Sequence, residues 1–201
     1  MTLQEIFVLN NILDGKDVYS LPPLSKLSMT QLLYNAAKDL LIKRGFLKNS
    51  DELTDEGVLI TKRLMSFKAA RKYIMIMGLT IGIVDKEQAV MMKKKAQNNY
   101  LITLIDIKNI TEQFFEVFDF IKAAEDSKTL KARKLEREEL EKEYSFKNAN
   151  FELKTKDDTK EICELCFCSD NQLYIYNCGE KMLYPKSYED VIKLFEERLV
   201  V

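Results

Sequence analysis

The fold is decided by three neighbouring apolar segments that we expect to form β-strands: YIMIMGLT at residues 73–80, AVMMKKK at 89–95 and YLITLIDI at 100–107. Directly behind them, the pattern TEQFF from Thr111 predicts the opening of an amphipathic helix. The first segment is apolar on both faces, which is typical of a central strand. This stretch therefore predicts a β-β-β-α unit.

The same order recurs near the end of the chain. FELKT at residues 151–155, ICELCFC at 162–168 and LYIYN at 173–177 read as strands, and a helix is predicted to open at Ser187. A unit that recurs within one chain indicates duplication. We therefore expect an α+β fold in which two pseudo-two-fold related β-β-β-α halves form an antiparallel sheet with flanking helices.

An N-terminal helical segment precedes the first half. Thr2 with Glu5, and Ser28 with Gln31, match capping boxes, and a third helix is predicted from near Thr54. The second of these helices carries one broad apolar stripe, made of Leu32, Leu33, Ala36, Ala37, Leu40 and Leu41. We expect a single domain over residues 1–201, with the N-terminal helices at 1–70, the first half at 71–125, a charged helical connector at 126–146 and the second half at 147–201.

The connector between the halves is dense in Lys, Arg and Glu from Glu125 to Tyr144. Opposite charges at helical spacing can hold such a stretch helical with little burial, either as one extension or as a second helix after a break near Asp126. We favour a solvated linker helix between the two halves. The alternative is a coiled-coil arm for a partner.

Charge and hydropathy argue against two classes of partner, nucleic acid and membranes. The 201 residues include 31 Lys or Arg and 32 Asp or Glu, so the formal net charge is −1 and no overall field attracts nucleic acid or anionic lipid. The most apolar stretch, residues 73–84, is too short to span a bilayer, and the first residues do not resemble a signal peptide. We expect a cytoplasmic protein that neither inserts into membranes nor binds nucleic acid.

Catalysis is not predicted. The chain contains no histidine, which removes the commonest general base and the usual partner of a Ser or Cys nucleophile. Its 6 glycines form no phosphate-binding loop. We therefore expect a protein that is not an enzyme and that has no catalytic residues and no cofactor.

The four cysteines superficially suggest zinc, because Cys163, Cys166 and Cys168 are closely spaced and Cys178 follows. Zinc ribbons place each C-x-x-C in a turn where both sulfurs converge, whereas this stretch alternates like a strand. Alternation sends Cys163 and Cys166 to opposite faces. We expect buried thiols rather than zinc ligands or disulfides.

A second local pattern suggests DNA binding. Residues 31–63 resemble the recognition helix and following stretch of winged-helix regulators, in which a helix, a glycine and an apolar pair precede "L-T-x-x-G", here Leu53 to Gly57. The candidate helix supplies few basic residues for phosphates and base edges. A winged-helix DNA-binding transcriptional regulator is the alternative function.

The order of the whole chain resembles the EspG family of cytoplasmic chaperones of type VII secretion. The residues that carry the resemblance are Leu3-Gln4-Glu5-Ile6-Phe7 in the opening helix, Pro22-Pro23 in an extended stretch and Arg44-Gly45-Phe46 at a helix end, followed by the two related halves. The resemblance implies a non-catalytic chaperone or adaptor that binds a helical secreted protein and keeps it soluble.

In that family the contact loop lies between the second and third strands. By resemblance it corresponds here to a lysine-rich hairpin end, whose candidate partner-binding residues are Lys93, Lys94, Lys95, Gln97, Asn98 and Asn99. The alternative interpretation is a solvated end whose lysines only protect a sheet edge.

Overall fold

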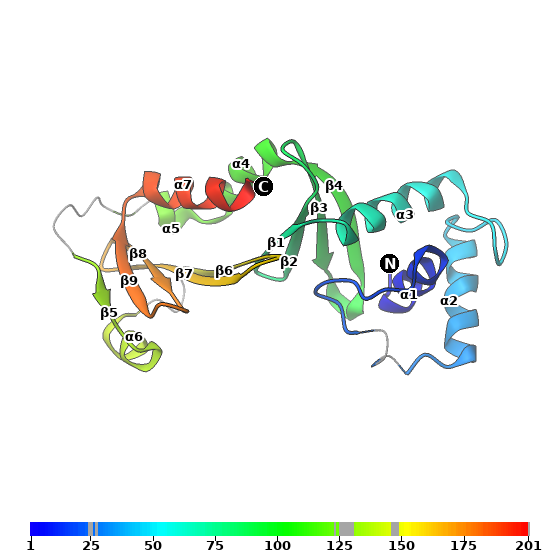
Figure 1. Ribbon diagram of the computed structural model, residues 1–201, viewed down its shortest axis with the longest axis horizontal. Helices are drawn as coiled ribbons and strands as arrows, with labels where there is room; N and C mark the ends of the chain where they lie inside the picture. Colours follow the sequence, from blue (N-terminus) through cyan, green and yellow to red (C-terminus); the bar gives the residue numbers. More distant parts are fainter. Residues whose placement is uncertain (24–25, 27, 123, 125–130, 146–148, 201) are drawn as a thin grey trace.

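The computed structural model covers residues 1–201 and describes residues 1–23, 26, 28–122, 124, 131–145 and 149–200. Within these residues, nine strands form one antiparallel sheet in the order β4-β3-β2-β1-β6-β7-β8-β9-β5 (Figure 1). The strands are β1 (Lys72–Ile76), β2 (Leu79–Ile83), β3 (Gln88–Lys94), β4 (Tyr100–Asp106), β5 (Arg133–Lys134), β6 (Asn150–Asp157), β7 (Glu161–Ser169), β8 (Gln172–Asn177) and β9 (Met182–Lys186).

The strand order confirms the duplicated α+β fold. The first strands of the two halves, β1 and β6, pair antiparallel at the centre, with Ile74 opposite Thr155. From this pair each half continues outward in chain order, through β2, β3 and β4 on one side and β7, β8 and β9 on the other. Antiparallel pairing of equivalent strands is the arrangement that a pseudo-two-fold axis through the sheet produces.

Each half nevertheless has a fourth strand, and the three-strand count was wrong. Residues 73–80 are not one strand, because Met77 and Gly78 turn the chain with φ of +46° and +78° and Ile76 pairs with Leu79. Two central residues with positive φ make the turn that suits a tight hairpin, and glycine adopts it without steric cost. Apolar residues on both sides of this turn conceal it in the sequence.

The missed strand of the second half is β9, which follows the last strand predicted there, at residues 173–177. Pro185 lies opposite Tyr174 of β8. On the other side of β9, β5 reaches only Met182 and Leu183. Pro185 therefore lies where β9 is an edge strand, which tolerates a residue without an N–H group.

One face of the sheet is covered by helices from both halves: α4 (Ile107–Val117), α5 (Asp119–Lys122) and α7 (Tyr188–Leu199) (Figure 1). α4 begins at Ile107, four residues before the predicted opening, because Asp106 caps it by accepting from the Lys108 N–H. α7 begins after Ser187 with the expected capping box to Asp190. These helices bury a phenylalanine-rich core against β1, β2, β6 and β7.

The opposite face of the first half is covered by α1 (Leu3–Leu13), α2 (Gln31–Lys43) and α3 (Asp55–Lys68). The capping box of Thr2 and Glu5 is present. The predicted capping box of Ser28 and Gln31 was wrong. The Thr30 hydroxyl accepts from the Leu33 N–H and caps α2. α3 packs on β2, β3 and β4, α1 packs on α3, and α2 packs mainly on α1.

In the part of the connector that the structure describes, the chain forms neither a solvated linker helix nor a coiled-coil arm. Residues 131–145 contain β5 and a short helix, α6 (Arg137–Glu143), and the rest of the predicted 125–144 helix lies outside the described residues. Leu135 and Leu140 are buried against β7, β8 and β9, and the Tyr176 hydroxyl donates to the Leu135 carbonyl oxygen at 3.0 Å. The connector therefore covers the second half on the same face that α1 and α3 cover in the first.

Candidate functional site

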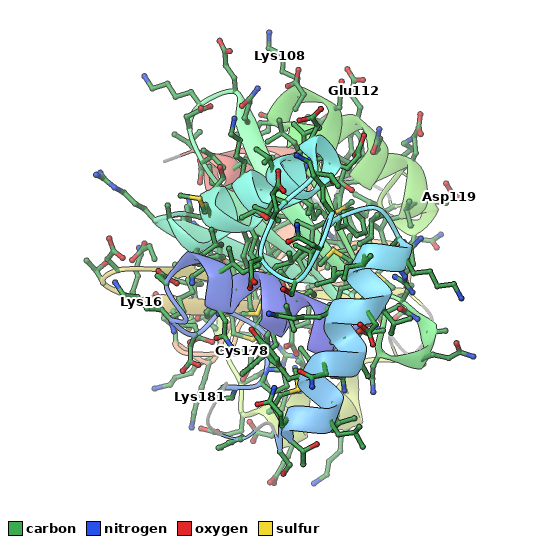
Figure 2. The ribbon with its side chains drawn as sticks, turned by 90° about the vertical axis from the view of Figure 1, so that its right-hand side faces the viewer. Lys16, Lys108, Glu112, Asp119, Cys178 and Lys181 are labelled. Atoms are coloured by element: carbon green, nitrogen blue, oxygen red, sulfur yellow. The ribbon has the colours of Figure 1, made fainter. Side chains whose placement is uncertain are left out.

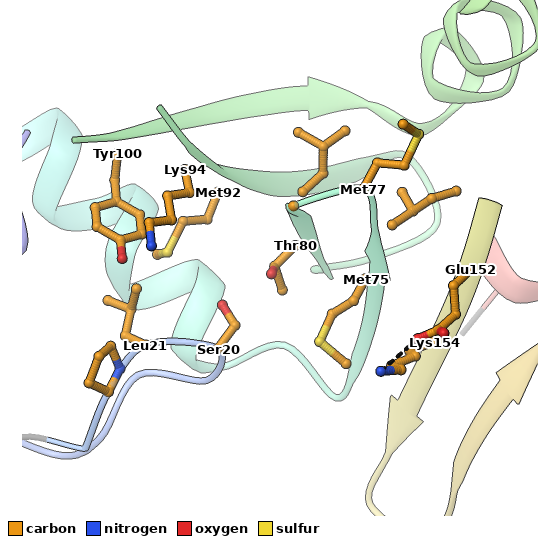
Figure 3. A pocket seen from close by; sticks show the side chains of 14 residues that line it. Ser20, Leu21, Met75, Met77, Thr80, Met92, Lys94, Tyr100, Glu152 and Lys154 are labelled. Atoms are coloured by element: carbon orange, nitrogen blue, oxygen red, sulfur yellow. Dashed lines mark ion pairs between the residues drawn. The ribbon is translucent and has the colours of Figure 1, made fainter. Parts of the chain in front are cut away.

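An open groove of approximately 660 Å³ lies over the central strands, between the N-terminal helices that cover the first half and the connector that covers the second (Figure 3). Its residues come from the segment after α1, from β1 to β4 and from β6, so that both halves contribute: Ser20, Leu21, Pro22, Met75, Ile76, Met77, Gly78, Leu79, Thr80, Met92, Lys94, Tyr100, Glu152 and Lys154. A groove of this size accommodates several side chains of a partner.

The groove has a methionine-rich floor. Met75 and Met77 lie on β1 and its turn, on the face opposite the buried Ile74 and Ile76, and Met92 reaches the groove from β3. Met77 is 68% exposed because the β1–β2 turn carries it outward. Flexible thioether side chains adapt to differently shaped partners, and an exposed apolar floor is typical of a binding surface.

Aromatic and hydrogen-bond contacts hold the wall that the segment after α1 forms. Tyr19 packs on Tyr73 with ring centroids 4.3 Å apart, and its hydroxyl donates to the Met75 sulfur at 3.6 Å. Burial raises the pKa of Tyr73 to about 12, with a smaller contribution from Tyr19, so that the Tyr73 hydroxyl stays neutral and donates to the Phe67 carbonyl. These contacts fix Leu21 and Pro22 at the side of the groove.

The opposite wall belongs to the second half. Glu152 and Lys154 alternate with buried residues along β6 and form an ion pair at 2.6 Å, which Figure 3 marks. The hydrogen bond to Glu152 raises the pKa of Lys154. Both side chains are substantially exposed, so the pair contributes little to stability and gives this wall a polar rim.

The three predicted lysines do not all lie on the same face of the sheet. Lys93, Lys94 and Lys95 are exposed, but only Lys94 lines the groove. Strand alternation explains this, because Lys94 follows Val90 and Met92 on the groove face, whereas Lys93 follows Ala89 and Met91 on the face that α4 covers. Within the described residues, no carboxylate lies within 4 Å of these three ammonium groups.

Gln97, Asn98 and Asn99 form the end of the same hairpin. Gln97 and Asn98 have φ of +58° and +56°, and a 3-10 turn, η2 (Ala96–Asn98), carries them into solvent. Asn99 bridges to Thr2, and the Tyr100 N–H donates to the Met1 carbonyl at 2.6 Å, so that the N-terminus holds the hairpin. With β2 counted, this loop joins the third and fourth strands, and the strand-by-strand correspondence with the EspG contact loop no longer applies.

The cysteines follow strand alternation. Cys166 is buried in the phenylalanine-rich core and Cys168 packs against it, whereas Cys178 packs on the opposite side of the sheet, beside Tyr176. Cys163 lies on the same side as Cys178. In the part of the chain that the structure describes, no three His, Cys, Asp or Glu side chains converge as a metal site would require.

The winged-helix pattern has a structural explanation. Thr54 caps α3 and its N–H donates to the Phe46 carbonyl at 3.1 Å. A Cβ at Gly57 would lie 1.9 Å from that carbonyl oxygen, so the close approach requires glycine. The motif therefore joins α2 to α3, whatever the function of the protein.

The apolar stripe of α2 is only partly buried. Ala37 and Leu41 pack on α1, but Leu32, Leu33 and Leu40 are exposed, Leu32 by 78%. Figure 2 views the molecule from this end, with α2 in front. The surface that a DNA reader would use for phosphates and bases is therefore largely apolar.

Sequence reasoning missed most groove residues. Met75 and Met77 lie more than 70 residues before Glu152 and Lys154, and only the strand register brings the two pairs together. The available signals were the Met77-Gly78 turn and the polar residues that alternate along β6. Lys94 is the one candidate residue that both the sequence and the groove select.

The comparisons with known proteins include a match to a protein family. The model of the family described as a domain of unknown function, DUF5081, matches residues 1–199. No curated protein matches the chain. Within the described residues, no helix is long and apolar enough to cross a membrane.

Proposed function

The chain belongs to the DUF5081 family, and we propose that it is a non-catalytic cytoplasmic binding protein, a chaperone or adaptor for a helical secreted substrate of a type VII secretion system. The observation that carries the proposal is the groove over β1 and β6, where the sheet lies open between two helical covers. The resemblance to the EspG family supplies the substrate class.

The shape and chemistry of the groove support a helical partner. Its floor is apolar and its rim is polar, with Lys94 on one side and the Glu152–Lys154 pair on the other. An amphipathic helix placed in such a groove buries its apolar face and keeps its polar face in water. A secreted helical protein with an exposed apolar end would be protected from aggregation in this way.

The lining residues support binding rather than catalysis. The ionisable residues that line the groove are Lys94, Tyr100, Glu152 and Lys154, and Glu152 and Lys154 form an ion pair with each other. A nucleophile with an adjacent base, which covalent catalysis requires, is not among these lining residues. The apolar exposed side of α2 and the net charge of −1 likewise favour a protein partner over DNA.

Replacing Met77 by aspartate is expected to weaken partner binding about tenfold, because a charge would then be buried against the apolar face of the helix. The fold should tolerate the change, since Met77 is 68% exposed and aspartate readily adopts positive φ. The partner is first identified by affinity purification from the native cytoplasm, and its affinity is then measured by calorimetry.

The matched control for this experiment is Met65→Asp on α3, which is 53% exposed and lies outside the groove lining. It should leave affinity unchanged. Equal affinity for the Met77 variant and the wild-type protein would remove the groove from the binding site. Recovery of DNA in place of a helical protein would overturn the proposed function.

Lys94→Glu and Lys93→Glu are expected to differ, although the residues are neighbours. Only Lys94 faces the groove, so its reversal should slow association with a partner whose rim is acidic, and added salt should reduce the difference. Melting temperatures of both variants should stay near the wild type, since both side chains are exposed. Equal association rates for the two variants, measured by stopped-flow mixing, would leave only edge protection for this loop.

A further inference from the structure

Cys163 and Cys178 are cross-strand neighbours on the face of the sheet that carries the groove. In the β7–β8 ladder Glu164 lies opposite Asn177, so the next pair outward is Cys163 and Cys178. The Cys178 N–H donates to the Cys163 carbonyl at 2.9 Å, which confirms that the ladder continues to this pair. Their side chains therefore emerge side by side.

The Cα spacing of such a pair is compatible with a disulfide. Hydrogen-bonded residues opposite each other in an antiparallel ladder have Cα atoms about 5.5 Å apart, inside the range of roughly 4.4–6.8 Å that disulfides span. Burial, with a smaller contribution from the neighbouring Cys178, raises the pKa of the Cys163 thiol to about 12, so Cys163 stays protonated at neutral pH. Cys178 follows the last residue of β8, where the backbone can adjust to the bond.

We propose that Cys163 and Cys178 form an oxidisable dithiol, which a peroxide converts into a cross-strand disulfide. Both residues are partly exposed, so a small oxidant can reach them. Cys178 is the attacking thiol, because burial holds the pKa of the Cys163 thiol well above its ordinary value and so disfavours a Cys163 thiolate. Cys163 is the resolving thiol.

Hydrogen peroxide would oxidise the two thiols to a disulfide in two steps. The Cys178 sulfur attacks a peroxide oxygen, so that an S–O bond forms, the O–O bond breaks and water leaves, with a sulfenic acid on Cys178. The Cys163 sulfur then attacks the sulfenic sulfur, an S–S bond forms, the S–O bond breaks and a second water leaves. The two thiols lose two electrons and two protons, and the peroxide is reduced to water.

The disulfide would form one strand away from the groove. Cys163 lies opposite Lys154 of β6, the rim residue that pairs with Glu152. Cys178 opens the β8–β9 turn, whose Lys181 pairs with Glu136 beside α6; Cys178 and Lys181 are both labelled in Figure 2. Oxidation would therefore tie β7 to this turn without using any residue that lines the groove.

The test treats the reduced full-length protein with hydrogen peroxide, alkylates the remaining thiols and maps the unreduced digest by mass spectrometry. The expected result is one linked peptide pair that contains Cys163 and Cys178, lost on reduction, while the buried Cys166 stays alkylatable after unfolding. Cys163→Ser should lose the link and leave a Cys178 sulfenic acid that dimedone traps.

Cys168→Ser is the matched control, because Cys168 is also partly exposed but packs on the other face. It should leave the link intact. A link between other cysteines, or no link in wild-type protein that circular dichroism shows to be folded, would overturn the proposal. The readout is covalent and needs no binding partner, so its failure would leave the proposed function untouched.

Discussion

Replacing Phe114 by alanine is expected to lower the free energy of unfolding by about 3–5 kcal/mol, the usual cost of deleting a buried aromatic ring. Phe114 lies on α4, and its ring stacks on Phe195 of α7 with centroids 4.1 Å apart. It also meets the edge of Phe151 on β6 at 5.1 Å. The ring thus joins a helix of the first half to a helix and a strand of the second.

The measurement is chemical denaturation of Phe114→Ala, Phe195→Ala and the double variant. Because the rings are in contact, the double variant should lose less than the sum of the single losses, with a coupling of about 0.5–1.5 kcal/mol. Phe114→Leu is the control that keeps most of the apolar volume, and it should cost clearly less than alanine. A loss below about 1 kcal/mol for Phe114→Ala would show that this core does not hold the two halves together.

Replacing Arg198 by methionine is the second large change, with an expected loss of about 2–4 kcal/mol. Arg198 on α7 donates to both carboxylate oxygens of Glu164 on β7, at 3.0 and 2.6 Å. Glu164 is only 4% exposed, so the variant would leave its charge buried without its partner. The partial exposure of Arg198 places the expected loss below that of a fully buried pair.

The double variant Glu164→Leu with Arg198→Met separates the two contributions to this loss. If the cost of Arg198→Met comes from the unpaired carboxylate, removing that carboxylate should restore most of the stability. Thermal and urea unfolding of the wild type, Arg198→Met and the double variant would decide it. A double variant that is as unstable as Arg198→Met would contradict the electrostatic explanation and indicate lost packing instead.

Most features that depend on a few neighbouring residues were predictable; the exception among the caps is that of α2, where Thr30 takes the place of Ser28. The cap at Thr2 with Glu5, the cap at Ser187 with Asp190 and the N-terminus of α3 at Thr54 all occur as expected. Each cap depends on a hydrogen bond between residues only three positions apart, so a short stretch of sequence contains both partners. The repetition of a strand-rich unit followed by a helix was visible for the same reason, because periodicity within one element is a local signal, although each half has four strands and not three.

Two further incorrect predictions concern the surroundings of an element rather than its local propensity. The six-residue apolar stripe of α2 gave no sign that Leu32 and Leu40 face solvent, because periodicity shows which residues share a face and not whether another element covers it. The charged connector was expected to be solvated, yet two leucines, Leu135 and Leu140, anchor it to the second half. Their burial depends on a site that β7, β8 and β9 create far away in the sequence.

The sequence by itself determined the α+β class, the duplication, the caps of α1, α3 and α7 and the alternation that separates Cys163 from Cys166. Only the tertiary structure decided the groove, because Leu21, Met75, Lys94 and Lys154 meet through the pairing of β1 with β6 and the packing of the segment after α1. The same holds for the cross-strand pair of Cys163 and Cys178, which the β7–β8 register creates. Long-range register depends on the burial of whole faces, and no short stretch of sequence contains that information.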